Sequence, residues 1–179
     1  LGALADPSVK KINLTVDGFS IIPENYERVR DAIIRGSITV RYNRSLRNPR
    51  SGLPYGRYTP SLDILELGFS SAPSAKAIGL IIHEATHAAC DIEKFDSMTI
   101  MTSEILAYVA QAIVMQTKSP DAAFEEDPVV ASSQLLAEMV LSGRQLNDDT
   151  LKSIRKAIED HPDYSSNASG EKMPYDGVR

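Results

Sequence analysis

Residues 74–90 of this chain read SAKAIGLIIHEATHAAC. Apolar residues recur in this stretch at spacings of three and four, which predicts an α-helix with a broad buried face over about 74–91. These residues are Ile78, Ile81, Ile82, Ala85, Ala88 and Ala89. A serine at 71 or 74 can cap the start of the helix, and the small alanines allow other elements to pack closely against its end.

The end of this predicted helix carries the pattern His83-Glu84-Ala85-Thr86-His87. Residues four apart on a helix lie about one turn apart on the same face, so both imidazoles can reach one ion. Zinc binds neutral imidazole nitrogens and, at catalytic sites, a third protein ligand, with one position left for water. Glu84 projects beside the histidines, where its carboxylate can take the proton of that water. The pattern therefore predicts a zinc site with Glu84 as general base.

The next predicted helix, residues 98–117, contains a candidate for the third zinc ligand. That segment is apolar nearly all round, and Glu104 stands almost alone as its charge. An unpaired carboxylate in an apolar environment is unfavourable by several kcal/mol unless it becomes neutral, and a nearby metal ion removes that cost. Glu104 is therefore the first choice for the third ligand.

The segment Ile82-His83-Glu84-Ala85-Thr86-His87-Ala88 resembles the active-site helix of the zincin metallopeptidases. The segment Ser103-Glu104-Ile105-Leu106-Ala107-Tyr108 is similar to the second helix of their glutamate-ligand, gluzincin-like subclass. The resemblance covers roughly residues 74–117. It implies that the two histidines and the glutamate of the second helix bind zinc, and that the glutamate between the histidines activates water. It also implies that a sheet edge above the active-site helix holds an extended substrate.

By this resemblance, the strand predicted at 61–68 is the candidate substrate edge. The metzincin subclass would place Gly at the third position after the second histidine, and His or Asp at the sixth; this chain has Cys90 and Glu93 there. Without glycine, the sharp turn that returns a ligand to the metal is harder to form. Glu93 and His161 stay open as alternatives to Glu104.

Other polar side chains near the motif have less specific roles. Tyr108 lies one helical turn from Glu104 on the same face and is a candidate hydrogen-bond donor to an oxyanion, although tyrosine at such a spacing is more often a core residue. Asp91 and Asp96 are candidate carboxylates for holding a ligand imidazole by its second nitrogen, with solvation at the helix end as the simpler interpretation.

The remaining periodicities predict an α+β fold, in which a small twisted N-terminal sheet covers a helical C-terminal part. The predicted strands are 11–16, 37–42 and 61–68, and the predicted helices are 23–35, 74–91, 98–117, 130–142 and 147–160. We expect one zincin-like domain over residues 1–161. Residues 162–179 contain Gly, Pro, Ser and Asn with little apolar content, which predicts a mobile tail.

A predicted loop at 43–60 joins the second and third strands and is rich in Pro, Gly, Asn and Ser. With its flanks it contains Arg41, Arg44, Arg47, Arg50 and Arg57 beside Tyr55 and Tyr58. A solvated connection is the simpler interpretation, and a binding surface for acidic groups is the alternative.

Composition excludes several classes of protein. A net charge of -5 and a pI near 5.2 argue against general nucleic-acid binding. Cys90 is the only cysteine, which excludes an internal disulfide and a cysteine-based zinc cage. We expect a soluble protein, because no apolar run is long enough to cross a bilayer. The chain begins at Leu1 with no signal-peptide pattern, which leaves export after removal of a signal peptide open.

The sequence therefore favours a zinc-dependent hydrolase whose substrate is a peptide or protein, with Zn²⁺ as cofactor. A catalytically silent zincin-like domain that binds proteins is the first alternative, and the presence of Glu84 argues against it. A helical structural module with incidental histidines is the second. Cleavage specificity depends on pocket shapes that periodicity does not reveal.

Overall fold

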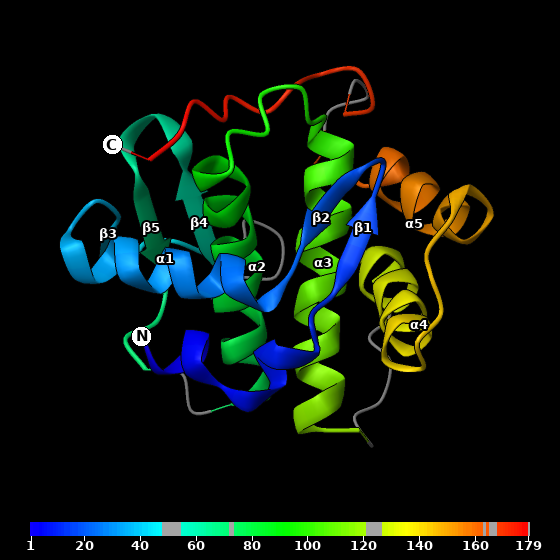
Figure 1. The fold of residues 1–179 in the computed structure, drawn as a ribbon, viewed down its shortest axis with the longest axis horizontal. Coiled ribbons are helices and arrows are strands. Elements are labelled where there is room, and N and C mark those ends of the chain that lie inside the picture. Colours follow the sequence, from blue (N-terminus) through cyan, green and yellow to red (C-terminus); the bar gives the residue numbers. More distant parts are fainter. Residues whose placement is uncertain (48–54, 72–73, 121–126, 163, 165–167, 179) are drawn as a thin grey trace.

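The structure, a computed structural model, describes residues 1–47, 55–71, 74–120, 127–162, 164 and 168–178. Helices make up most of this part of the chain, and short strands form two small sheets (Figure 1). The α+β class that the sequence predicts is confirmed.

Two long helices, α2 (Ala75–Ile92) and α3 (Ile100–Lys118), lie side by side at the centre of the molecule (Figure 1). The side chains of Ser74 and Thr99 accept backbone N–H groups in the first turns of α2 and α3, respectively. The connection between the helices is short, which favours antiparallel packing. The central pair forms where the sequence predicts helices at 74–91 and 98–117.

Three further helices surround this pair, and all three were predicted. They are α1 (Pro23–Arg35), α4 (Pro128–Leu141) and α5 (Asp148–Asp160). Helix α1 packs on α2, α4 packs on α3, and α5 packs on α4. Gly36 ends α1 with a left-handed φ of 80°, as its position after the helix predicts. Within the described residues, none of the helices has both the length and the apolar character that a membrane crossing requires.

The N-terminal strands β1 (Leu14–Val16) and β2 (Phe19–Ile21) form an antiparallel hairpin of their own. Asp17 and Gly18 make its turn with φ values of 51° and 84°, a conformation that suits a tight two-residue hairpin. The strand predicted at 11–16 is thus shorter than expected, because Pro7–Lys11 forms a 3₁₀-helix.

A second sheet has the order β3-β5-β4, where β3 is Thr39–Tyr42, β4 is Gly56–Thr59 and β5 is Ile64–Leu67. Strand β5 pairs in parallel with β3 and antiparallel with β4. Two expectations are corrected. The predicted loop 43–60 contains strand β4, whose sequence Gly-Arg-Tyr-Thr has no aliphatic residue and lies in a stretch rich in Pro and Gly. The predicted strand 61–68 becomes the central strand of the sheet, so β4 is the edge beside α2.

The C-terminal segment, defined here as residues 168–178, packs against the central helices instead of forming the mobile tail that was expected. The N–H of Met173 donates to the carbonyl of Met98, and the carbonyl of Glu171 accepts from the N–H of Ile100. The side chain of Tyr175 is buried. The segment is held mainly by hydrogen bonds and by few apolar side chains. Its composition is therefore similar to that of a flexible terminus.

A buried carboxylate, Asp91 near the end of α2, joins this segment to the sheet. Its Oδ2 accepts a hydrogen bond of 2.8 Å from the hydroxyl of Tyr58 in β4, and its Oδ1 accepts one of 3.0 Å from the N–H of Gly177. Burial raises the pKa of Asp91. The side chain therefore connects α2, β4 and the C-terminal segment.

Replacing Asp91 by alanine should destabilise the fold by about 3 kcal/mol, because two buried donors lose their acceptor. Chemical denaturation of the metal-free protein measures this. As a control, Asp160→Ala removes an exposed ion pair with Lys156 and should leave the free energy of unfolding nearly unchanged, because solvent screens such a pair. Equal effects of the two substitutions would contradict a linking role for Asp91.

Candidate metal centre

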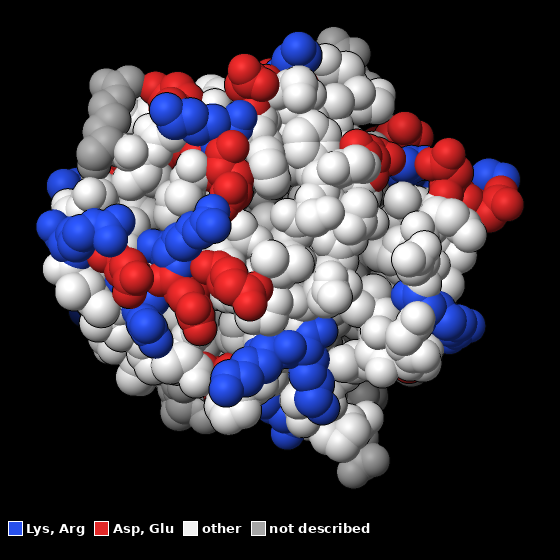
Figure 2. All heavy atoms as spheres, viewed as in Figure 1, with Lys and Arg blue, Asp and Glu red and all other residues white. Residues whose placement is uncertain are grey.

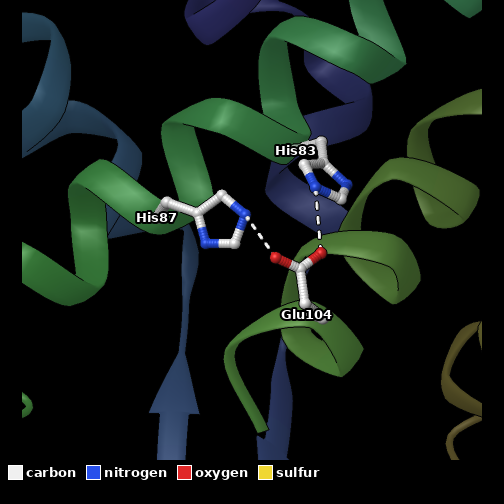
Figure 3. A group of neighbouring side chains, drawn as sticks. All are labelled: His83, His87 and Glu104. Carbon is white, nitrogen blue, oxygen red and sulfur yellow. Dashed lines mark ion pairs between the residues drawn. The ribbon is translucent and has the colours of Figure 1, made fainter. Parts of the chain in front are cut away.

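Three side chains from the central helices converge on one point: His83 and His87 of α2 and Glu104 of α3 (Figure 3). Nε2 of His83 lies 3.5 Å from Oε2 of Glu104, and Nε2 of His87 lies 3.5 Å from Oε1 of Glu104. One ligand atom from each residue lies within 4.8 Å of the others. In tetrahedral coordination with bonds of about 2.1 Å, ligand atoms lie about 3.4 Å apart. The three residues are therefore close enough to bind one metal ion.

The convergence follows from how α2 and α3 fold and pack. His83 and His87 are one helical turn apart, so both side chains leave the same face of α2 (Figure 3). Glu104 lies in the second turn of α3, directly after the short connection, which brings it opposite the later turns of α2. The structure thus brings together the three residues that the sequence predicts as metal ligands.

The alternative third ligands lie outside this cluster. Glu93 forms an ion pair with Arg28 of α1 and accepts a hydrogen bond from Asn25. Around α1, acidic and basic side chains are interspersed on the face drawn in Figure 2. Nε2 of His161 lies 3.4 Å from Oδ2 of Asp127, away from the three-residue group.

Burial and neighbouring charges favour the protonation states of His87 and Glu104 that can bind a metal ion. Burial of His87 lowers its pKa to about 4, so the imidazole is neutral at neutral pH. Burial alone would raise the pKa of Glu104, but the adjacent histidines outweigh this effect and lower it to about 2. A neutral imidazole and an ionised carboxylate are the forms that bind a metal ion.

The carboxylate of Glu84 is positioned by strand β4. Its Oε2 accepts a hydrogen bond of 2.8 Å from the backbone N–H of Tyr58. Gly56 lies so close that an added Cβ would be 2.5 Å from Cγ of Glu84, so only glycine fits without a shift. Burial raises the pKa of Glu84 to about 7. The structure therefore holds Glu84 beside the metal-binding cluster, under the edge strand.

The far nitrogens of the two imidazoles have different surroundings. Nδ1 of His87 lies 2.9 Å from Oγ of Ser103 and 3.1 Å from the hydroxyl of Tyr175. Among the described residues, Nδ1 of His83 has no hydrogen-bond partner although it is buried. The expected role of Asp91 and Asp96 in holding an imidazole is corrected, because Asp91 binds Tyr58 and Gly177 and Asp96 is exposed.

Two tyrosines lie against the other side of the cluster. The ring of Tyr108 contacts the ring of His83 edge-on, with centroids 4.6 Å apart. The hydroxyl of Tyr164 lies 2.9 Å from Oε2 of Glu104 and 2.9 Å from the hydroxyl of Tyr108. Each hydroxyl has one hydrogen, so Tyr108 donates to Tyr164, which donates to Glu104. Tyr108 therefore lies at the site as predicted, but its proton is used within this chain of hydrogen bonds.

Sequence reasoning missed Ser103, Tyr164 and Tyr175, the three hydroxyl residues that hold the ligands. Ser103 was quoted only as the neighbour of Glu104, and the tyrosines lie in the segment expected to be mobile. The available signal was weak: aromatic residues at 164 and 175 within an otherwise polar stretch.

Comparison of the chain with protein-family models, curated proteins and solved structures gave no match. What this centre does is therefore inferred from the geometry and chemistry of its residues.

Replacing Glu104 by alanine should lower the affinity for a divalent metal ion about 100-fold, because the only acidic group of the cluster is lost. Titration against a chromophoric chelator measures the affinity, and elemental analysis measures occupancy. His83→Ala and His87→Ala should lower occupancy as strongly. Glu93→Ala is the matched control and should leave affinity unchanged. Full affinity in Glu104→Ala would show that another residue is the third ligand.

Replacing Gly56 by alanine should destabilise the protein by about 2 kcal/mol, since the new methyl group must displace the buried side chain of Glu84 or strand β4. Thermal and chemical unfolding measure the change. Gly2→Ala is the control: nothing lies within 4 Å of the position of its Cβ, and its effect should stay below about 0.5 kcal/mol. If the two variants unfold alike, β4 does not press on Glu84 as described.

Proposed function

We propose that this protein is a zinc-dependent hydrolase that cleaves peptide bonds, with Glu84 as general base. The observation that carries the proposal is the position of Glu84, a buried carboxylate held next to a cluster of two histidines and a glutamate. A metal-binding cluster alone is compatible with storage or structural roles. A positioned acid–base group beside it favours hydrolysis.

The donor set is suited to zinc. Two imidazole nitrogens and one carboxylate oxygen are a common set of protein ligands at catalytic zinc sites, where water takes the fourth position. The same donors also occur at non-haem iron(II) sites. The spacing of His83 and His87 around Glu84 favours zinc, because iron(II) oxygenation requires no protein base between the histidines.

A zinc ion at this site would lower the pKa of water and polarise a substrate carbonyl. Glu84 then accepts the proton of the attacking water and returns it to the leaving amine. The hydrogen bond from Tyr58 holds Oε2 of Glu84, which leaves Oε1 for this proton. The raised pKa of Glu84, about 7, suits a group that must both accept and release a proton near neutral pH.

Strand β4 supports a peptide as the substrate class. It is an edge strand of the β3-β5-β4 sheet, and the N–H of Tyr58 points away from β5 toward Glu84. A peptide in extended conformation that follows the outer edge of β4 would therefore pass next to the general base. Backbone pairing of this kind binds peptides largely independently of their side chains.

Replacing Glu84 by glutamine should keep zinc bound and lower kcat/KM about 1000-fold, because the amide has the same shape but accepts no proton. A peptide library with mass-spectrometric detection identifies a cleaved sequence, and zinc content is measured on the same preparation. Glu93→Gln is the matched control and should retain activity.

Full activity of Glu84→Gln would contradict the assigned mechanism. A wild-type protein that binds zinc but cleaves no peptide would favour the silent protein-binding module. A purified protein that holds iron and restores function only with iron(II) would contradict the choice of metal.

A further inference from the structure

Nδ1 of His87, the ring nitrogen that faces away from Glu104, lies beside two hydroxyl groups from different parts of the chain. Ser103 comes from α3 and Tyr175 comes from the C-terminal segment. Both hydroxyls lie within hydrogen-bond distance of Nδ1 of His87, at 2.9 and 3.1 Å, and they lie 2.6 Å from each other. Tyr175 is only 2% exposed and His87 is 7% exposed, so water does not readily replace these contacts.

We propose that Tyr175 is a positioning residue for His87, and that the C-terminal segment is thereby an integral part of the metal centre. Binding of the metal ion and docking of this segment are then coupled. The inference rests on the proposed metal site, and it concerns how the chain controls the affinity of that site.

Metal binding and Tyr175 are linked first through the proton of the His87 imidazole, whose position depends on whether Nε2 binds a metal ion. Without a metal ion, the carboxylate oxygen Oε1 of Glu104, 3.5 Å from Nε2 of His87, favours the tautomer with its proton on Nε2, and Nδ1 then accepts a hydrogen bond from a hydroxyl. When Nε2 gives its lone pair to a metal ion, the proton must be on Nδ1, and Nδ1–H needs an acceptor. A hydroxyl group both donates and accepts, so the pair formed by Ser103 and Tyr175 satisfies the imidazole in either state.

Metal binding and docking of the C-terminal segment are linked second through the backbone contacts of that segment. The C-terminal segment is anchored where α2 ends and α3 begins: Gly177 donates to Asp91, and Met173 donates to the carbonyl of Met98. These anchors flank the connection that sets Glu104 opposite the histidines. An ion that fixes the arrangement of His87 and Glu104 therefore also favours the docked position of the segment. Coupling between two binding events is reciprocal, so docking raises metal affinity by the same factor.

His83 provides an internal comparison. Within the described part of the chain, its Nδ1 makes no hydrogen bond, and neither Tyr175 nor Ser103 reaches it. Loss of the Tyr175 hydroxyl should therefore perturb His87 and leave His83 nearly unchanged. A general loosening of the core would affect both imidazoles.

The test is Tyr175→Phe in the full chain, which removes the hydroxyl and keeps the ring. It should weaken zinc affinity about tenfold and change the imidazole ¹⁵N chemical shifts of His87 but not of His83. Tyr26→Phe is the matched control: Tyr26 is also buried, and its hydroxyl lies 2.8 Å from Oγ1 of Thr86, the residue before His87, and not at an imidazole nitrogen. It should leave zinc affinity unchanged.

Hydrogen exchange measures the coupling directly. Zinc should slow exchange of the Met173 and Gly177 amides in the wild-type protein, and slow it less in Tyr175→Phe. If Tyr175→Phe does not fold, Ser103→Ala removes the other hydroxyl of the pair and should likewise weaken zinc affinity.

Equal zinc affinity in the wild type, Tyr175→Phe and Ser103→Ala, with no effect of zinc on the two amides, would overturn the inference and leave the proposed hydrolase intact. Absence of zinc binding by the wild type would overturn both. Because none of these measurements uses enzymatic activity, a protein that binds zinc as described but cleaves no peptide would refute the proposed function and still support the inference.

Discussion

The constraint on which the structure depends is the carboxylate of Glu104, an acid in the largely apolar helix α3 that faces two histidines of α2. A carboxylate in such a place needs polar partners, and the imidazoles of His83 and His87 and the hydroxyl of Tyr164 lie against it. This contact joins α2 and α3, which pack against each other along their lengths. The metal-binding geometry and the helix packing therefore share the same contact.

Polar groups around this contact form a connected set. Tyr58 of β4 uses its backbone N–H to hold Glu84 and its hydroxyl to hold Asp91, so one residue ties the edge strand to two acids of α2. Asp91 in turn binds the C-terminal segment through Gly177. Each acid has a donor suited to it, which allows several carboxylates to be buried within one small region.

The same set explains why the centre is built from distant parts of the sequence. Helices α2 and α3 provide the candidate ligands, strand β4 holds Glu84, the proposed general base, and the stretch after α5 contributes hydroxyls to Glu104 and His87. The candidate ligands thus lie on helices, where neighbouring side chains fix them, and two of the supporting hydroxyls lie on the stretch that follows α5. Stability and metal affinity are thus expected to depend on overlapping residues.

The sequence by itself determined the helices, the α+β class and the three converging residues. Periodicity is a local property, and both the spacing of His83 and His87 and the isolation of Glu104 in an apolar helix are visible without any contact map. Strand β4, the central place of β5, the role of Asp91 and the docking of residues 168–178 were decided only by the tertiary structure. The physical reason is that a short strand and a polar terminal segment are held by partners far away in the chain. The side chain of Glu84 occupies the space that a Cβ at position 56 would take, and the hydroxyl of Tyr175 is buried within hydrogen-bond distance of His87 and Ser103.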